Sequence, residues 1–185
     1  MNTATIGTLS SRYAKALYAF AANNNEEEKV YDEMKYLSYE LIHTPDLKKA
    51  FLNPILSFDR KKDILEISVG GDASSSIKRF FEFVYKKDKQ NLLLYISAAF
   101  LSVYRKAKNI VYVKIEAATQ LSNNITDKIK EHILKEYEQK TAIEMEIVIN
   151  PEIIGGFIIN INGNQLDLSV KGELNNFRKT ILKNI

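Results

Sequence analysis

The sequence contains no cysteine among its 185 residues. This absence excludes disulfide bonds, thiol nucleophiles and thiolate metal sites together. Histidine is scarce too: His43 and His132 lie far apart without the spacing of metal ligands, so we expect ordinary surface or helix-flank roles for both. The sequence therefore predicts no metal site and no bound cofactor.

Long apolar runs are also missing. No stretch approaches the roughly 20 residues that a bilayer-spanning helix needs. The first residues show no basic segment followed by an apolar stretch, so we expect no signal or transit peptide. These features together predict an intracellular protein.

Motifs for catalysis or phosphate binding are not found either. Gly155 and Gly156 lack the spacing of a phosphate-cradling loop and precede an apolar strand, so a bulge or a tight backbone approach is the favoured interpretation. No G-x-S-x-G elbow occurs. Exposed faces of helices and strands explain the paired acids, which are Asp59 with Asp63 and Glu144 with Glu146. We predict no catalytic residue.

Charge is balanced, with a formal net charge of +3. Residues 1–108 carry 17 basic and 13 acidic side chains, and residues 109–185 carry 9 and 10. A nucleic-acid-binding protein would be expected to concentrate basic residues in one stripe, so this mild asymmetry does not indicate such a partner. A hydrophobic fraction of 45% is typical of a globular protein.

Residues 1–108 show helical periodicity and predict six amphipathic helices. The clearest follows residues 74–76, with apolar side chains at i, i+3, i+4, i+7 and i+8. They are Ile77, Phe80, Phe81, Val84 and Tyr85. Ser57 is expected to cap the preceding helix, with Ile64, Leu65 and Ile67 facing inward. The first helix is expected from Ser10 or Ser11.

Residues 109–185 change to a mixed pattern. Strict alternation predicts strands over 110–117 and 143–149, and helical spacing predicts a helix over 126–140 with Ile125, Ile129 and Ile133 inward. Asn162-Gly163 between two apolar runs predicts a β-hairpin. A terminal helix is expected after Ser169. Its apolar stripe would be Val170, Leu174, Phe177 and Ile181. The predicted fold class is α+β: a six-helix bundle over 1–108, then a small α/β domain over 109–185.

Four segments resemble one known family. Residues 11–18 read S-R-Y-A-K-A-L-Y and residues 51–54 read F-L-N-P. Residues 150–157 read N-P-E-I-I-G-G-F, and residues 162–174 read N-G-N-Q-L-D-L-S-V-K-G-E-L. In this order they resemble the signatures of the δ subunits of F-type ATP synthases, the bacterial counterparts of the mitochondrial oligomycin-sensitivity-conferring protein.

The chain departs from this family at several positions. Asn162-Gly163 stands where glycine and aspartate are usual, so one acid is lost. Leu168 stands where glycine is common. Lys171 and Glu173 stand where many members have arginine, and the change at Glu173 reverses a charge.

The resemblance implies a non-catalytic stator subunit without a cofactor. Its partners would be the N-terminal segments of the α subunits and the C-terminal segments of the peripheral-stalk b subunits, with no nucleic acid. It would lie at the cytoplasmic face of the bacterial inner membrane and meet that membrane only through the complex. The expected α-subunit site on the bundle comprises Tyr13, Ala16, Leu17, Phe20, Phe80, Phe81 and Val84. The expected b-subunit site on the α/β domain comprises Gly155, Gly156, Asn162, Gly163, Lys171 and Glu173.

Two other interpretations remain. An unrelated helical scaffold with an α/β tail would have the same composition, although the ordered signatures would not be expected of it. A small enzyme that binds a phosphorylated ligand at Gly155 and Gly156 is the more distant alternative.

Overall fold

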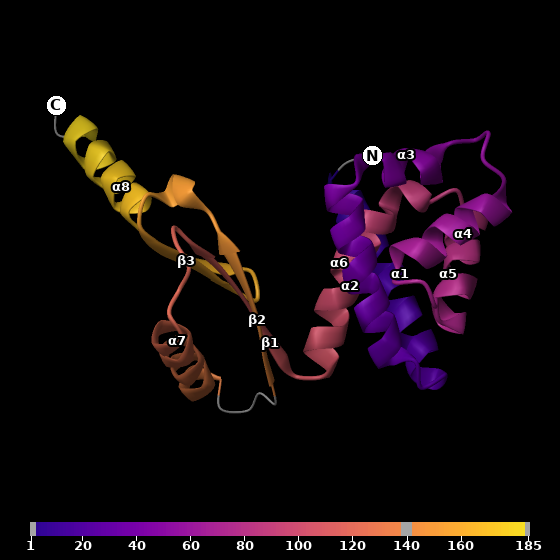
Figure 1. Cartoon of the computed structure of the whole chain (residues 1–185), viewed down its shortest axis with the longest axis horizontal. Coiled ribbons are helices and arrows are strands. Elements are labelled where there is room, and N and C mark those ends of the chain that lie inside the picture. The colour runs from indigo at the N-terminus through magenta and orange to yellow at the C-terminus, as the bar shows by residue number, and fades with distance from the viewer. Residues whose placement is uncertain (1–2, 138–141, 184–185) are drawn as a thin grey trace. The chain divides into compact units, whose positions relative to one another are not determined.

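A computed structural model describes residues 3–137 and 142–183, and the chain forms two compact units, Met1–Tyr104 and Arg105–Ile185 (Figure 1). We refer to them as the helical unit and the α/β unit. The predicted α+β class is confirmed, with a helical bundle followed by a four-stranded sheet and its helices.

Six α-helices form the helical unit, as the sequence predicts. They are α1 (Thr3–Asn23), α2 (Glu27–His43), α3 (Pro45–Leu52), α4 (Phe58–Ser68), α5 (Ser75–Lys86) and α6 (Leu93–Ala107), the last preceded by the short helix η1 (Gln90–Leu92). The first helix begins at Thr3, well before the expected Ser10, because the small and polar residues that open it also tolerate helical geometry.

The caps at the starts of α4 and α5 form as expected. The Ser57 hydroxyl accepts from the Arg60 N–H, and the Ser74 hydroxyl accepts from the Ile77 N–H. On α5, four apolar residues of the predicted stripe are buried. They are Ile77, Phe80, Phe81 and Val84.

The inward face of α4 is partly different from the prediction. Leu65 is buried, but Ile67 is 77% exposed, and Lys61 takes an interior position at 1% exposed. The aliphatic stem of a lysine can pack like an apolar side chain while its ammonium approaches an aromatic ring. Here the Lys61 Nζ lies 4.8 Å from the centre of the Tyr85 ring.

Aromatic contacts fill the core of the bundle. Phe81 packs between Phe51 and Phe58, with ring centres 5.3 and 6.1 Å away. Tyr104 of α6 stacks on Tyr31 of α2 at 4.1 Å. Ile96 and Phe100 of α6 are fully buried.

The α/β unit contains one mixed sheet in the order β2-β1-β3-β4. Its elements are β1 (Ile110–Ala117), α7 (Asn123–Glu136), β2 (Ala142–Ile149), η2 (Pro151–Ile153), β3 (Gly156–Ile161), β4 (Asn164–Ser169) and α8 (Val170–Lys183). β1 pairs in parallel with β2 across the α7 connection, and β3 pairs antiparallel with both β1 and β4. Both predicted strands and the hairpin are confirmed.

The core of this unit lies between α7 and one face of the sheet (Figure 1). Every second residue of β1 is fully buried, from Val111 to Ala117. From α7, Ile133 is buried and Ile129 packs beside it, whereas Ile125 is 40% exposed. The helix begins at Asn123 rather than Thr126. The end predicted at Lys140 lies outside the described residues.

The last helix leaves its apolar stripe uncovered. Val170, Leu174 and Phe177 of α8 are 40%, 55% and 66% exposed. The fourth member of the predicted stripe, Ile181, has a side chain outside the described part of the structure. α8 continues directly from β4 and contacts chiefly β4 and η2 (Figure 1), so most of its surface is available to a partner.

Candidate functional site

An apolar groove runs between α1 and α5 of the helical unit. Its volume is about 300 Å³. The residues that line it are Ala16, Leu17 and Phe20 of α1 with Arg79, Phe80 and Phe83 of α5. The two helices are antiparallel here, since the Asn24 side chain reaches Ser76 while Tyr13 lies beside Phe83. A groove between two antiparallel helices with aromatic walls can accept an amphipathic helix.

Most of the expected bundle residues gather at this groove. Ala16, Leu17, Phe20 and Phe80 line it. Tyr13 adjoins it, with its ring centre 6.4 Å from Phe80 and 5.7 Å from Phe83.

Two of the expected bundle residues lie elsewhere. Phe81 and Val84 are 1% and 0% exposed and belong to the interior of the bundle. They support α5 from behind and do not line the groove.

Sequence reasoning missed Arg79 and Phe83. Phe83 is 47% exposed and therefore forms an accessible wall of the groove. The sequence feature that could have identified Phe83 is an aromatic side chain three residues after Phe80 that falls outside the predicted buried stripe. A large apolar residue in that position has no core to fill, and this favours a binding role.

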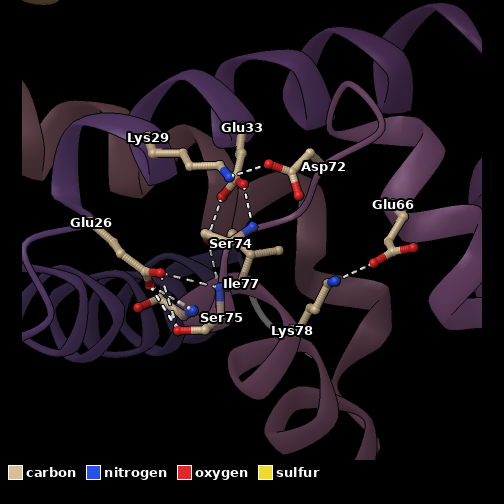
Figure 2. A network of polar contacts seen from close by, with 10 residues as sticks. Glu26, Lys29, Glu33, Glu66, Asp72, Ser74, Ser75, Ile77 and Lys78 are labelled. Carbon is tan, nitrogen blue, oxygen red and sulfur yellow. Dashed lines mark hydrogen bonds and ion pairs between the residues drawn. The ribbon is translucent and has the colours of Figure 1, made fainter.

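The N-terminus of α5 is held by two carboxylates of the α2 segment (Figure 2). Glu33 accepts from the Ser74 N–H at 2.5 Å and from the Ser74 hydroxyl at 2.6 Å. Glu26 accepts from the Ser76 N–H at 2.9 Å and from Ser75. With the Ser74 hydroxyl bound to the Ile77 N–H, the first N–H groups of α5 all have side-chain acceptors.

These contacts shift the pKa values of the two carboxyl groups in opposite directions. Burial raises the pKa of Glu33, which is 4% exposed, although the hydrogen bonds from Ser74 oppose the shift. The hydrogen bond from the Ser76 hydroxyl lowers the pKa of Glu26. Ion pairs flank the network (Figure 2): Lys29 with Asp72 at 2.7 Å, and Lys78 with Glu66. The position of α5, and hence of one groove wall, depends on these contacts.

A second apolar groove lies in the α/β unit, between α7 and the β3–β4 hairpin. Its volume is about 660 Å³. Ile129, Ile133, Phe157, Ile159 and Ile161 belong to its walls, and Leu166 and Leu168 are 56% and 47% exposed along β4. Lys128, His132 and Glu136 supply a polar rim. The sequence predicted these elements but not the groove, because alternation assigns a face without showing whether another element covers it.

The expected glycines of this unit have backbone roles. At Gly156, φ is +72° and a Cβ would lie 2.2 Å from the Leu168 carbonyl oxygen, so only glycine allows β3 to approach β4 there. The Gly155 carbonyl accepts from the Val170 N–H at 3.0 Å. The pair leads into a strand, in agreement with the predicted tight backbone approach.

Asn162 and Gly163 form the hairpin turn with φ of +51° and +97°. The Asn162 side chain accepts from the Tyr112 N–H at 3.2 Å, and the Asn162 N–H donates to the Tyr112 carbonyl at 3.1 Å. This turn therefore joins the hairpin to β1.

The expected b-subunit residues do not form one cluster. In the β3–β4 register, Gly156 pairs with Ser169 at one end of the hairpin, and Ile161 pairs with Asn164 beside the turn at the other. Lys171 and Glu173 are exposed on the first turn of α8, where Lys171 lies 3.9 Å from Glu152. The α7 groove lies between these two ends, because its β4 residues run from Asn164 to Leu168.

Residues 3–137 and 142–183 contain no cluster of three or more potential metal ligands. His43 is exposed and its Nδ1 lies 2.8 Å from the Tyr39 carbonyl oxygen, while His132 belongs to the α7 groove. Across the same described ranges, no helix has both the length and the apolar character to cross a bilayer.

A family model and full-length relatives all point to one protein family. A family model described as the ATP synthase delta (OSCP) subunit matches residues 9–181. The ATP synthase subunit delta of Parabacteroides distasonis is 33% identical over 181 residues, which cover 97% of this chain and 98% of that protein. The subunit delta of Phocaeicola vulgatus is 32% identical, with coverages of 96% and 95%.

The fold also has a solved counterpart. A chain in the cryo-EM structure of the Toxoplasma gondii mitochondrial ATP synthase hexamer superposes with a TM-score of 0.74 at 20% identity. The match covers 94% of this chain and 97% of that one. At this identity the similarity concerns the fold alone.

Proposed function

The chain belongs to the ATP synthase delta (OSCP) subunit family, and we propose that its two units bind two different partners within the synthase. It has the stator function of that family and is a structural subunit without catalysis of its own. In the proposed division, the helical unit binds N-terminal segments of the α subunits, and the α/β unit binds C-terminal segments of the b subunits.

The observation that carries the proposal is the open α1/α5 groove. A helical segment with apolar residues every three or four positions would lay them against Phe20, Phe80 and Phe83. Such burial contributes roughly 25 cal/mol for each Å² of apolar surface removed from water. Because Phe83 is half exposed and Phe80 is buried behind it, the groove has both an accessible wall and a fixed floor.

The α/β unit would use the groove between α7 and the β3–β4 hairpin. Its exposed leucines, Leu166 and Leu168, offer an apolar surface to a helix of the b subunit. The uncovered stripe of α8 adds Leu174 and Phe177 as further apolar contacts. This assignment moves the b-subunit site from the separate turn and glycine residues to the surface between them.

The mechanical role requires slow dissociation. Torque from the rotating shaft acts on the catalytic head, so a joint that opens during rotation would allow the head to turn with the shaft. Affinity differences among related interfaces are expressed mainly in dissociation rates, and two apolar grooves with fixed walls favour long-lived contacts. We further propose that the chain meets the cytoplasmic face of the bacterial inner membrane only through the complex.

The α-subunit site can be tested by isothermal titration of the full chain with a peptide of the first ~20 residues of the same organism's α subunit. We expect saturable binding that Phe83→Asp abolishes. Tyr95→Asp is the matched control, because Tyr95 on α6 is 48% exposed and Phe83 is 47% exposed. Equal binding by both variants would contradict the groove assignment.

The b-subunit site can be tested in the same way with a peptide from the C-terminus of the b subunit. Leu166→Asp changes the groove, and Leu134→Asp is its control, since Leu134 is 50% exposed on α7 without lining the groove. We expect loss of binding in the first variant only.

A further inference from the structure

The charged residues of α1 and α5 are predominantly basic. α1 contains Arg12 and Lys15 and no acidic residue. α5 contains Lys78, Arg79 and Lys86 with a single acid, Glu82. The apolar groove between these helices is thus bordered by positive charge.

Some of these charges are already neutralised. Lys86 pairs with Glu82 at 3.0 Å, and Lys78 pairs with Glu66 of α4. Among the residues that the structure describes, Arg12 and Arg79 have no ion pair with an acid. Both are exposed, and Arg79 itself lines the groove.

Helical spacing fixes where these guanidinium groups lie. Arg79 precedes Phe83 by four residues, so the two side chains are neighbours on one face of α5. Arg12 precedes Ala16 of the groove by four residues on α1. Basic groups therefore stand beside the apolar contacts and not on a remote face.

We infer that the α1/α5 groove selects an amphipathic helix whose polar flank carries a carboxylate next to its apolar anchors, with Arg79 as the residue that binds this carboxylate. The inference rests on the proposed function and specifies the chemistry of its partner. The occupant would carry Asp or Glu three or four residues from an apolar residue that packs on Phe83. A guanidinium binds a carboxylate through two parallel hydrogen bonds, and this geometry favours one orientation of the incoming helix.

The charged border has a second effect on recognition. Charge at the rim of an interface acts mainly on association rate, salt dependence and the choice of partner, while the apolar groove supplies most of the affinity. An apolar helix without acidic residues would bind more weakly. A helix with a basic flank would be repelled by Arg12 and Arg79.

The test measures binding of the full chain to two peptides by fluorescence anisotropy. The first is the ~20-residue N-terminal peptide of the same organism's α subunit, and in the second every Asp and Glu of that peptide is replaced by Lys. Arg79→Glu is the test variant. Lys48→Glu on α3 is the control, because it makes the same charge change at an exposed position outside the groove.

We expect the wild type to prefer the acidic peptide and to lose affinity as salt rises. Arg79→Glu should weaken binding of the acidic peptide by about ten-fold, since it removes one rim pair and adds a like charge. The same variant should bind the lysine peptide more tightly than the wild type does. Lys48→Glu should reproduce the wild-type preference.

Two results would overturn the inference, and they differ. If the acidic peptide binds wild type and Arg79→Glu equally at all salt concentrations, the groove recognises apolar shape alone. If the folded wild type binds neither peptide, the proposed function fails and the inference fails with it. In that second case, binding of the wild type to phosphatidylglycerol vesicles would assign the basic border to a lipid surface instead.

Discussion

Glu33 on α2 binds Ser74 at the start of α5 through both the backbone N–H and the hydroxyl, at 2.5 and 2.6 Å. The two residues are 41 positions apart in the sequence, and the contact is buried. It fixes the first turn of the helix that provides one wall of the α1/α5 groove. Stability of the bundle and geometry of the groove are therefore connected through one carboxylate.

Removing this carboxylate should destabilise the helical unit. In Glu33→Ala the Ser74 N–H and hydroxyl lose their acceptor in a buried position, and each unsatisfied group costs about 1 to 3 kcal/mol. We expect a loss of about 2 to 4 kcal/mol in the free energy of unfolding. Urea unfolding of the full chain, followed by circular dichroism, measures it. Glu28→Ala on the exposed side of α2 should change stability by less than about 0.5 kcal/mol.

Glu33 should make the stability of the helical unit depend on pH. Its pKa is raised in the folded state, so the folded protein binds more protons than the unfolded chain between the ordinary glutamate pKa and the raised one. The stability difference between wild type and Glu33→Gln should therefore decrease as pH rises through that window. Two neighbouring charges also act on the pKa of Glu33: Lys29 lowers it and Glu26 raises it.

The contribution of Glu26 to stability should depend on pH with the opposite sign. Hydrogen bonds from Ser76 lower its pKa, so its contribution is present above the ordinary glutamate value and is lost as pH falls through the lowered one. The advantage of wild type over Glu26→Gln should decrease on acidification. Urea midpoints between about pH 3 and pH 7 would separate the two carboxylates. Parallel profiles for the two variants would contradict this description of the network.

Three glycines should respond differently to alanine. Gly156→Ala puts a Cβ 2.2 Å from the Leu168 carbonyl oxygen at φ +72°, so the α/β unit should lose more than about 3 kcal/mol or fail to fold. Gly163→Ala has open space at φ +97° and should cost about 1 kcal/mol. Gly7→Ala, in an open helical position of α1, should stabilise by about 0.5 to 1 kcal/mol. Thermal unfolding of the three variants would establish the order.

The sequence predicted the elements well because local signals and tertiary packing agree in them. The stripe of α5, the alternation of β1 and the Asn162-Gly163 turn each arise from spacing or backbone preference within a few residues. Prediction failed where a distant side chain decides the outcome. On α4 the buried residues are Lys61, Leu65 and Ser68, and Ile67 lies outside that face. Lys61 can take an interior position because its Nζ lies over the Tyr85 ring, and spacing within α4 does not reveal Tyr85.

The candidate site was predictable to a similar extent. The resemblance placed the expected α-subunit site on α1 and α5, but spacing did not distinguish Phe81, which faces the core, from Phe83, which faces the groove. In the α/β unit the turn and glycine residues were selected by resemblance, whereas the groove forms only when α7 lies across the hairpin. The position of a helix on a sheet is set by tertiary packing, and the periodicity of each separate element does not predict it.

The proposal that this chain holds the catalytic head through the α1/α5 groove can be tested in the whole synthase. Its most direct test is ATP-driven proton pumping by the synthase reconstituted in vesicles with Phe83→Asp, beside the Tyr95→Asp control. We expect pumping to be lost in the first variant while ATP hydrolysis by the head persists, and both activities to be normal in the control. Normal pumping by a Phe83→Asp chain that no longer binds the α-subunit peptide would contradict it.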